Sequence, residues 1–197
     1  MIDMLRRVIF LLLFFFSTES IAQEYETLTN RKWGFFAGYN GFRLENFGLQ
    51  IGAENYLATA RNFQIVGISS LQFYTQKELQ SGIDLNFRFG QRFTANYGVL
   101  LESYIGLGVA YTTYSSPTID FTTGDSSVTK SSKWGVKPNI TLGIGYDFNR
   151  KLDLSLITYA RTNISWLYPD RNLVFQTIPF LEIGVIITPK LKKMKSH

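Results

Sequence analysis

Residues 134–148 read WGVKPNITLGIGYDF, and their pattern indicates the class of fold. Apolar or aromatic side chains occupy every second position from Trp134 to Phe148. The positions between them carry glycine or polar side chains, among them Lys137 and Asp147. Such period-two alternation predicts a β-strand with one apolar and one polar face.

The length of this stretch indicates a strand that crosses a membrane. Strands of soluble proteins usually have about five or six residues. A strand tilted by about 40° crosses the apolar band of a membrane barrel, roughly 25 Å tall, in about ten residues. Aromatic residues stand at both ends of the apolar face, as they do in the interfacial girdles of such barrels.

The first residues have the pattern of an export signal. Arg6 and Arg7 precede the apolar run Val8–Phe16, and small residues at Ser20 and Ala22 form a cleavage site. A membrane anchor would need about twenty apolar residues, so we expect a signal peptide cut after Ala22 rather than an anchor. The expected organisation is a signal peptide over 1–22, a barrel over 23–189 and a basic tail over 190–197.

Composition excludes several classes of protein. The chain has no cysteine, which excludes a lipid-anchored lipoprotein, disulfides and thiolate metal sites. Its net charge of +5 comes largely from lysines of the tail, and the other basic residues are scattered along the chain. We therefore expect no nucleic-acid partner, because a nucleic-acid site would gather the basic residues on one face.

Strand-like segments follow one another along the whole mature chain. The eight expected strands are 32–39, 47–57, 62–74, 81–93, 97–114, 134–148, 151–161 and 173–187. The connections alternate between a longer polar set (40–46, 75–80, 115–133, 162–172) and a short set (58–61, 94–96, 149–150). Outer-membrane barrels have this asymmetry of external loops and periplasmic turns. The predicted fold class is all-β, an eight-stranded antiparallel up-and-down transmembrane β-barrel.

Alternation alone does not decide which face points outward. A soluble lipocalin-like barrel would turn its apolar face inward, around a ligand. Here the polar face is rich in glycine, whereas a water-exposed outer face would carry many lysines and glutamates. Small residues suit the crowded interior of an eight-stranded barrel. We therefore predict that the apolar face contacts lipid.

This assignment places both signs of charge in the interior, where each charge needs a partner. The expected interior network consists of Glu54, Asp84, Glu102, Asp147, Asp153 and Glu182 with Arg88, Arg92, Lys137 and Arg161. We expect an internal plug of salt bridges. A narrow polar pathway, or carboxylates such as Glu102 and Glu182 acting as acid and base, are the alternatives.

Catalytic and metal-binding patterns are missing from the sequence. The one histidine is His197, the last residue of the chain, which excludes the usual Ser-His constellations. Asp120 and Asp125 are too sparse for a calcium loop. We expect no catalytic residue, no metal and no cofactor.

Three segments carry a family resemblance. Phe47–Leu57 (FGLQIGAENYL), Tyr97–Tyr111 (YGVLLESYIGLGVAY) and Leu181–Ile187 (LEIGVII) resemble small outer-membrane barrels of the Bacteroidota type, similar to the OmpA transmembrane domain, OmpX and OmpW. The resemblance implies a single barrel in the outer membrane and leaves its activity open. The chain departs from the family in ending ten residues after Ile187 rather than on an aromatic residue, and no peptidoglycan-binding domain is expected.

The favoured function is a non-enzymatic barrel with a structural or loop-mediated binding role. Its loop candidates are Trp166, Leu167 and Tyr168, with the Ser/Thr-rich segment 115–133. The alternative is a small channel or transporter for small or hydrophobic solutes. Expected partners are outer-membrane lipid, including lipopolysaccharide, and the outer-membrane assembly machinery, and we expect a monomer.

Overall fold

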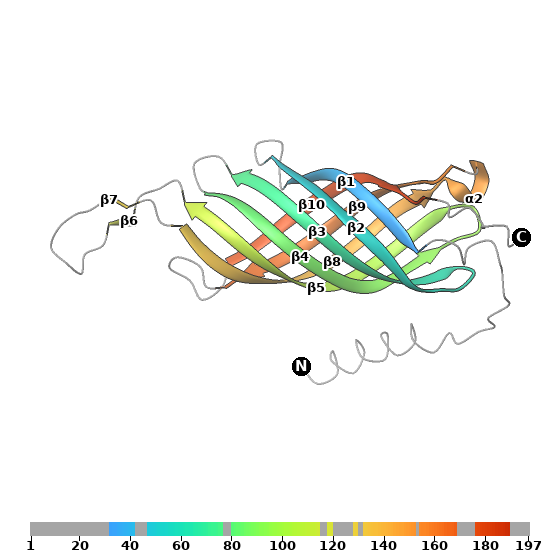
Figure 1. Ribbon diagram of the computed structural model, residues 1–197, viewed down its shortest axis with the longest axis horizontal. Coiled ribbons are helices and arrows are strands. Elements are labelled where there is room, and N and C mark those ends of the chain that lie inside the picture. Colours follow the sequence, from blue (N-terminus) through green and yellow to red (C-terminus); the bar gives the residue numbers. More distant parts are fainter. Residues whose placement is uncertain are drawn as a thin grey trace, which may run out of the picture.

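Eight strands close into one antiparallel barrel in the computed structural model (Figure 1). The barrel strands are β1 (Trp33–Gly41), β2 (Gly48–Thr59), β3 (Phe63–Gln76), β4 (Gln80–Thr94), β5 (Val99–Tyr114), β8 (Ser132–Asp147), β9 (Leu156–Leu167) and β10 (Gln176–Ile187). The structure describes residues 32–41, 47–76, 80–114, 118–119, 128–129, 132–152, 154–168 and 176–189. The predicted fold class is confirmed.

The strands follow one another around the barrel in chain order, and the first pairs with the last. Their order is β1-β10-β9-β8-β5-β4-β3-β2, and every neighbouring pair is antiparallel. Closure occurs where β1 lies beside β10, with Ala37 opposite Val185. Because the ring is closed, no strand of the barrel wall is left with an unpaired edge.

Two small elements lie outside the barrel wall. Strands β6 (Thr118–Ile119) and β7 (Val128–Thr129) pair with each other within the connection from β5 to β8. A single helical turn, α2 (Asn149–Leu152), stands between β8 and β9. Among the described residues, no helix has the length and apolar character needed to cross a membrane.

The two ends of the barrel differ in their connections. At one end, called the short-turn end here, the turns at 60–62 and 95–98 and the α2 connection join the strands. The other end, called the loop end, holds the connections 42–46, 77–79, 115–131 and 169–175. Strand β1 begins and β10 finishes at the short-turn end (Figure 1).

Side chains alternate between the outer surface and the interior. Along β8, Trp134 and Leu142 are 68% and 62% exposed, whereas Lys137 between them is 1% exposed. The same alternation follows the other strands, with leucine, isoleucine, valine and aromatic side chains outside. The prediction that the apolar face points outward is confirmed.

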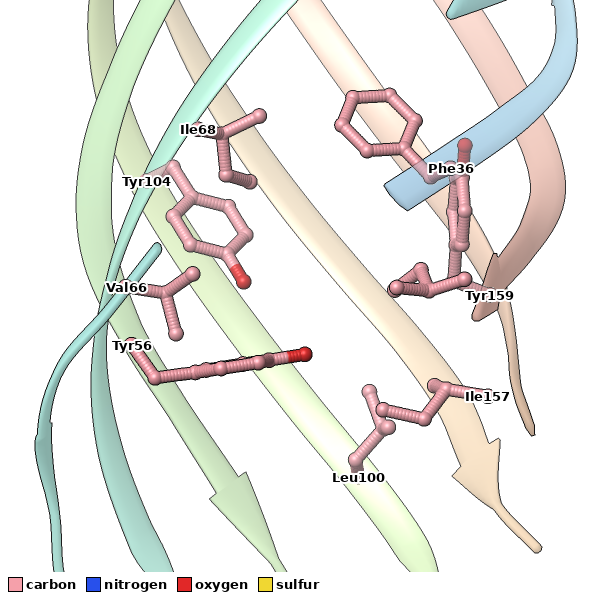
Figure 2. Close-up of a cluster of buried hydrophobic side chains, with 9 residues drawn as sticks. Phe36, Tyr56, Val66, Ile68, Leu100, Tyr104, Ile157 and Tyr159 are labelled. Carbon is pink, nitrogen blue, oxygen red and sulfur yellow. The ribbon is translucent and has the colours of Figure 1, made fainter. Parts of the chain in front are cut away.

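The interior also holds apolar side chains, which the sequence did not predict there. One cluster lies near the short-turn end, where Leu100 and Ile157 point toward one another beneath the rings of Tyr56 and Tyr159 (Figure 2). A second cluster near the loop end includes Leu167 and Phe180. Charged side chains occupy the space between the two clusters.

The predicted seventh strand, 151–161, is wrong in its bounds. Residues Asn149–Leu152 form the turn α2, in which the Leu152 amide donates to the Phe148 carbonyl over 2.8 Å. Strand β9 begins only at Leu156 and continues to Leu167, because the alternation of inward polar side chains runs on past Arg161. The expected loop 162–172 is therefore wrong for residues 162–167.

Candidate functional site in the barrel interior

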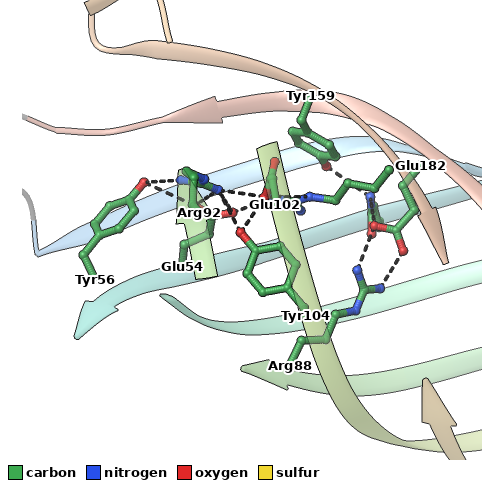
Figure 3. Close-up of polar contacts among 10 residues, drawn as sticks. Glu54, Tyr56, Arg88, Arg92, Glu102, Tyr104, Tyr159 and Glu182 are labelled. Atoms are coloured by element: carbon green, nitrogen blue, oxygen red, sulfur yellow. Dashed lines mark hydrogen bonds and ion pairs between the residues drawn. The ribbon is translucent and has the colours of Figure 1, made fainter. Parts of the chain in front are cut away.

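Four side chains form the largest charged group, called the quartet here: Glu54, Arg92, Glu102 and Arg161 (Figure 3). They come from β2, β4, β5 and β9. Arg92 Nη2 lies 2.8 Å from Glu54 Oε2 and 3.2 Å from Glu102 Oε2. Arg161 Nη2 lies 2.8 Å from an oxygen of each glutamate.

Tyrosines add further contacts to the quartet. Tyr104 donates to Glu102 Oε2 over 2.5 Å, and Tyr56 donates to Glu54 Oε2 over 3.2 Å. The guanidinium of Arg161 stacks 4.0 Å from the ring centre of Tyr159. Burial of four charges is tolerated because each cation has two carboxylates and each carboxylate two cations.

A second group joins opposite parts of the wall. Arg88 on β4 donates to Glu182 on β10 through both terminal nitrogens, over 2.8 and 2.6 Å. Such two-pronged pairing is the strongest arginine–carboxylate geometry. Asn163 donates to the same carboxylate over 3.1 Å, and Gln50 donates over 3.3 Å.

A third group lies nearer the loop end. Lys137 on β8 donates to Asp84 on β4, and both side chains are buried. The ammonium also sits 4.5 Å from the ring centre of Phe180 and 5.3 Å from that of Tyr74. Aromatic faces attract a cation, so the rings compensate part of the lost hydration of Lys137.

The structure separates the two carboxylates that the sequence offered as an acid–base pair. Glu102 belongs to the quartet, whereas Glu182 binds Arg88. Glu102 shares its arginines with Glu54 instead. Within the described residues, no group of three or more histidine, cysteine, aspartate or glutamate side chains is arranged to hold a metal ion.

The other predicted network residues have different places. Asp147 is buried at the end of β8, where its carboxylate accepts from the backbone amide of Asn149 over 3.0 Å at the start of α2. Asp153 lies outside the described residues. Residues that the prediction missed include Tyr56 and Tyr104, although each follows an inward glutamate by two positions and so shares its face.

The expected loop candidates belong mostly to a strand, which corrects that prediction. Trp166 and Leu167 are the last residues of β9, and Leu167 points inward with 2% exposure. Tyr168 is half exposed and forms an isolated bridge with Val136. Only Tyr168 of the three therefore lies beyond the end of β9.

Comparison with solved structures gives barrels of the same architecture. Neisserial surface protein A has 10% identity and a TM-score of 0.50, with 79% of this chain and 94% of that chain covered. Ail, the attachment invasion locus protein of Yersinia pestis, has 12% identity and a TM-score of 0.49, with 80% of this chain and 98% of that chain covered. The N-terminal β-barrel domain of Pseudomonas aeruginosa OprF has 15% identity and a TM-score of 0.46, with 80% of this chain and 97% of that chain covered.

These similarities define a class through the fold alone. The chain has the fold of the small eight-stranded antiparallel barrels of outer membranes. Neither protein-family models nor curated proteins gave a match. Function must therefore be argued from the side chains of this barrel.

Proposed function

We propose that this chain is a non-enzymatic, integral outer-membrane protein whose interior is closed and whose loop end faces the outside of the cell. One observation carries the proposal. Large apolar side chains cover the outside of the wall, while charged side chains are paired inside it. A barrel in water would have to expose that apolar surface, whereas lipid accommodates it.

The arrangement of the interior supports closure. Four acidic and four basic side chains pair within the three groups, and none of them is more than 4% exposed. Ions would have to separate these pairs, and a buried charge without its partner is costly. The cluster at the short-turn end adds a mainly apolar layer, in which the hydroxyls of Tyr56 and Tyr104 already bind carboxylates of the quartet.

Two features support a role without catalysis. The carboxylates of the quartet and Glu182 are all engaged by arginine, which leaves them poorly suited to proton transfer. The single histidine of the chain, His197, stands in the basic tail. Binding would then fall to the loop end, with Tyr168 and segment 115–133 as candidates, and lipid with lipopolysaccharide would surround the wall.

Conductance in a planar lipid bilayer tests the proposal. The mature protein, refolded in detergent, is expected to insert and remain electrically silent. Insertion is checked separately through quenching of its tryptophans by brominated lipid, since Trp33 and Trp134 are exposed on the wall. Discrete openings that change in size in an Arg88→Gln variant would contradict a closed interior.

A small channel remains the second candidate, and specific atoms favour it. The buried side chains of Asn40, Asn86 and Thr141 each have a polar atom without a hydrogen-bond partner. Buried polar atoms are usually satisfied by ordered water when protein offers no partner. A file of water through the interior would satisfy them. Conductance of the unsubstituted protein, in which the Arg88–Glu182 pair is intact, would favour this candidate.

A further inference from the structure

Two turns face each other across the short-turn end of the barrel: the one between β8 and β9, which holds α2, and the one between β2 and β3. In the closed ring, β10 and β1 lie between β9 and β2 on one side, and β5 and β4 lie between β8 and β3 on the other. Each path around the ring therefore passes two strands, so the two turns stand at opposite points of the mouth. A contact between them has to span the opening.

One side chain makes that contact. Arg150, the second residue of α2, donates through Nη2 to the backbone carbonyl of Arg61 in the turn between β2 and β3. Arg150 is half-buried and its Nε atom is fully buried, so the middle of the side chain lies against other parts of the protein. The turn Asn149–Leu152 with the Arg150 side chain is called the strap here.

The strap starts from a fixed base. The Asp147 carboxylate accepts from the Asn149 amide over 3.0 Å, which holds the first residue of α2. The Asp147 amide donates to the Gly98 carbonyl over 2.7 Å, so the base is joined to the turn between β4 and β5. Gly98 has a φ of 101°, and a Cβ there would lie 2.8 Å from the Asp147 carbonyl oxygen. Glycine is therefore the residue that allows this junction.

The acceptor side of the strap is also tied to its neighbours. The Asn62 carbonyl accepts from the Thr94 amide over 2.8 Å, which joins the turn between β2 and β3 to the end of β4. Further along the mouth, the Lys32 carbonyl accepts from the Tyr56 amide over 3.1 Å, between the neighbouring strands β1 and β2. These backbone bonds follow the circumference of the mouth, whereas the bond from Arg150 crosses it.

An apolar layer lies inside this end of the barrel. Leu100 and Ile157 are the first inward-facing side chains of β5 and β9, and neither is more than 2% exposed (Figure 2). Water that entered through the short-turn mouth would meet this layer first. The carboxylates of the quartet, which bind the hydroxyls of Tyr56 and Tyr104, lie next to it.

We propose that the strap is a releasable lid on the short-turn mouth, which keeps water from the apolar layer and from the quartet. This inference rests on the proposed function and deepens it, because it assigns closure on that side to one turn. The acceptor of the Arg150 bond is a neutral carbonyl at the end of the barrel, so release lets both groups bind water. Separating an ion pair of the quartet would instead leave buried charges without partners. The lid can therefore open without disturbing the interior.

The reactivity of a single thiol tests the lid. The chain has no cysteine of its own, so Leu100→Cys places one thiol behind the strap. In a second protein, Ala110→Cys places one in the cluster near the loop end. Each mature protein is refolded in detergent, and the rate of its alkylation by iodoacetamide is measured. Resistance to sodium dodecyl sulfate without heating shows that each sample is folded.

Arg150→Met removes the donor and keeps most of the length of the side chain. It should raise the alkylation rate at position 100 by about 10- to 100-fold, the factor that corresponds to one hydrogen bond from a charged donor. The rate at position 110 should stay unchanged. Arg150→Gln, which is too short to span the mouth, should act in the same way and serves as a second variant. Lys151→Met is the matched control, because Lys151 is the exposed neighbour in α2, and it should change neither rate.

An unchanged rate at position 100 in the folded Arg150 variants would overturn the lid and leave the closed interior standing. An equal rise in Lys151→Met, or an equal rise at position 110, would also overturn it, because the whole barrel would then have loosened. Alkylation at both positions as fast as in the urea-unfolded chain, with the strap intact, would be a different result. It would refute the closed interior of the proposed function and the lid with it.

Discussion

Each buried charge in this barrel is tolerated only because another side chain compensates it. Taking an ion out of water costs several kcal/mol, and an ion pair offsets this only with good geometry and further hydrogen bonds. The bidentate contact of Arg88 with Glu182 and the shared contacts of the quartet meet that condition. The interior is therefore sensitive to loss of one partner and much less sensitive to loss of both.

The Asp84–Lys137 pair offers the clearest test of this asymmetry, because Lys137 is the only side chain among the described residues that forms an ion pair with Asp84. Lys137→Met should lower the free energy of unfolding by about 3 to 5 kcal/mol, since it leaves Asp84 charged and buried. Adding Asp84→Leu should recover most of that loss. Urea unfolding in lipid vesicles measures the free energy of unfolding of the single and the double variant. Equal destabilisation of the single and double variants would contradict the argument.

Gly143 makes room for Arg161 of the quartet. A Cβ at Gly143 would lie 2.7 Å from Cγ of Arg161, which is too close for an unstrained contact. We expect Gly143→Ala to cost about 1 to 3 kcal/mol of unfolding free energy through overpacking.

Gly67 is the matched control for this substitution. A Cβ there would meet only Leu57 Cδ1, at 3.7 Å, an ordinary contact. Gly67→Ala should therefore be neutral or slightly stabilising, because alanine restricts the unfolded chain. The same urea unfolding experiment compares the two variants. A similar loss in both would mean that strand propensity, rather than the space around Arg161, governs these positions.

At the scale of an element, β8 shows how the two faces of one strand suit two environments. Its outward face is apolar and its inward face carries Lys137, Asn139 and Thr141. Pro138 has no amide hydrogen, and the continuous ladder to β9 begins only at Asn139 opposite Ser165. Beyond it a single bridge joins Val136 to Tyr168. The pairing between β8 and β9 is thus interrupted near the loop end.

A charge on the outward face of β8 tests what that face touches. Ile140 lies in the middle of the strand and is 46% exposed, whereas Ser132 is its first residue. In a bilayer, Ile140→Arg should cost about 2 to 4 kcal/mol of folding free energy, and Ser132→Arg about 1 kcal/mol or less. Folding titrations in lipid vesicles measure both values. If both substitutions were harmless, the face would contact water rather than lipid.

At the scale of the whole molecule, the wall is independent of its longest connection. Strands β5 and β8 pair directly as far as Thr113 opposite Ser132, so the ring is complete without residues 115–131. Loop length contributes to folding free energy only weakly, by about 0.6 kcal/mol for each doubling.

Replacing residues 115–131 with Asn-Gly should therefore leave the barrel folded, with a change in unfolding free energy of about 1 kcal/mol or less. Resistance to sodium dodecyl sulfate without heating measures directly whether the shortened barrel is folded. The shortened protein also serves as the control for any binding assigned to the loop end. Failure of the shortened chain to fold would show that this connection takes part in forming the wall.

The amino-acid pattern was enough to predict the all-β class, the approximate position of most strands and the face on which most of their residues lie. Period-two alternation is a local property, so a polar residue such as Lys137 or Glu182 can be assigned to the inner face from its neighbours alone. Alternation failed where local signals were ambiguous. Leu152 resembled a strand residue yet lies in α2, and Trp166 resembled a loop residue yet ends β9.

The contacts between interior residues became visible only in the folded barrel. Arg161 reaches Glu54 across the barrel, and these residues are far apart in sequence and lie on strands that do not pair. Their contact depends on the order, tilt and closure of all eight strands, which no local pattern specifies. The same closure separates Glu102 from the pairing of Glu182 with Arg88, and it gathers Lys32, Arg61 and Lys151 at one end of the barrel.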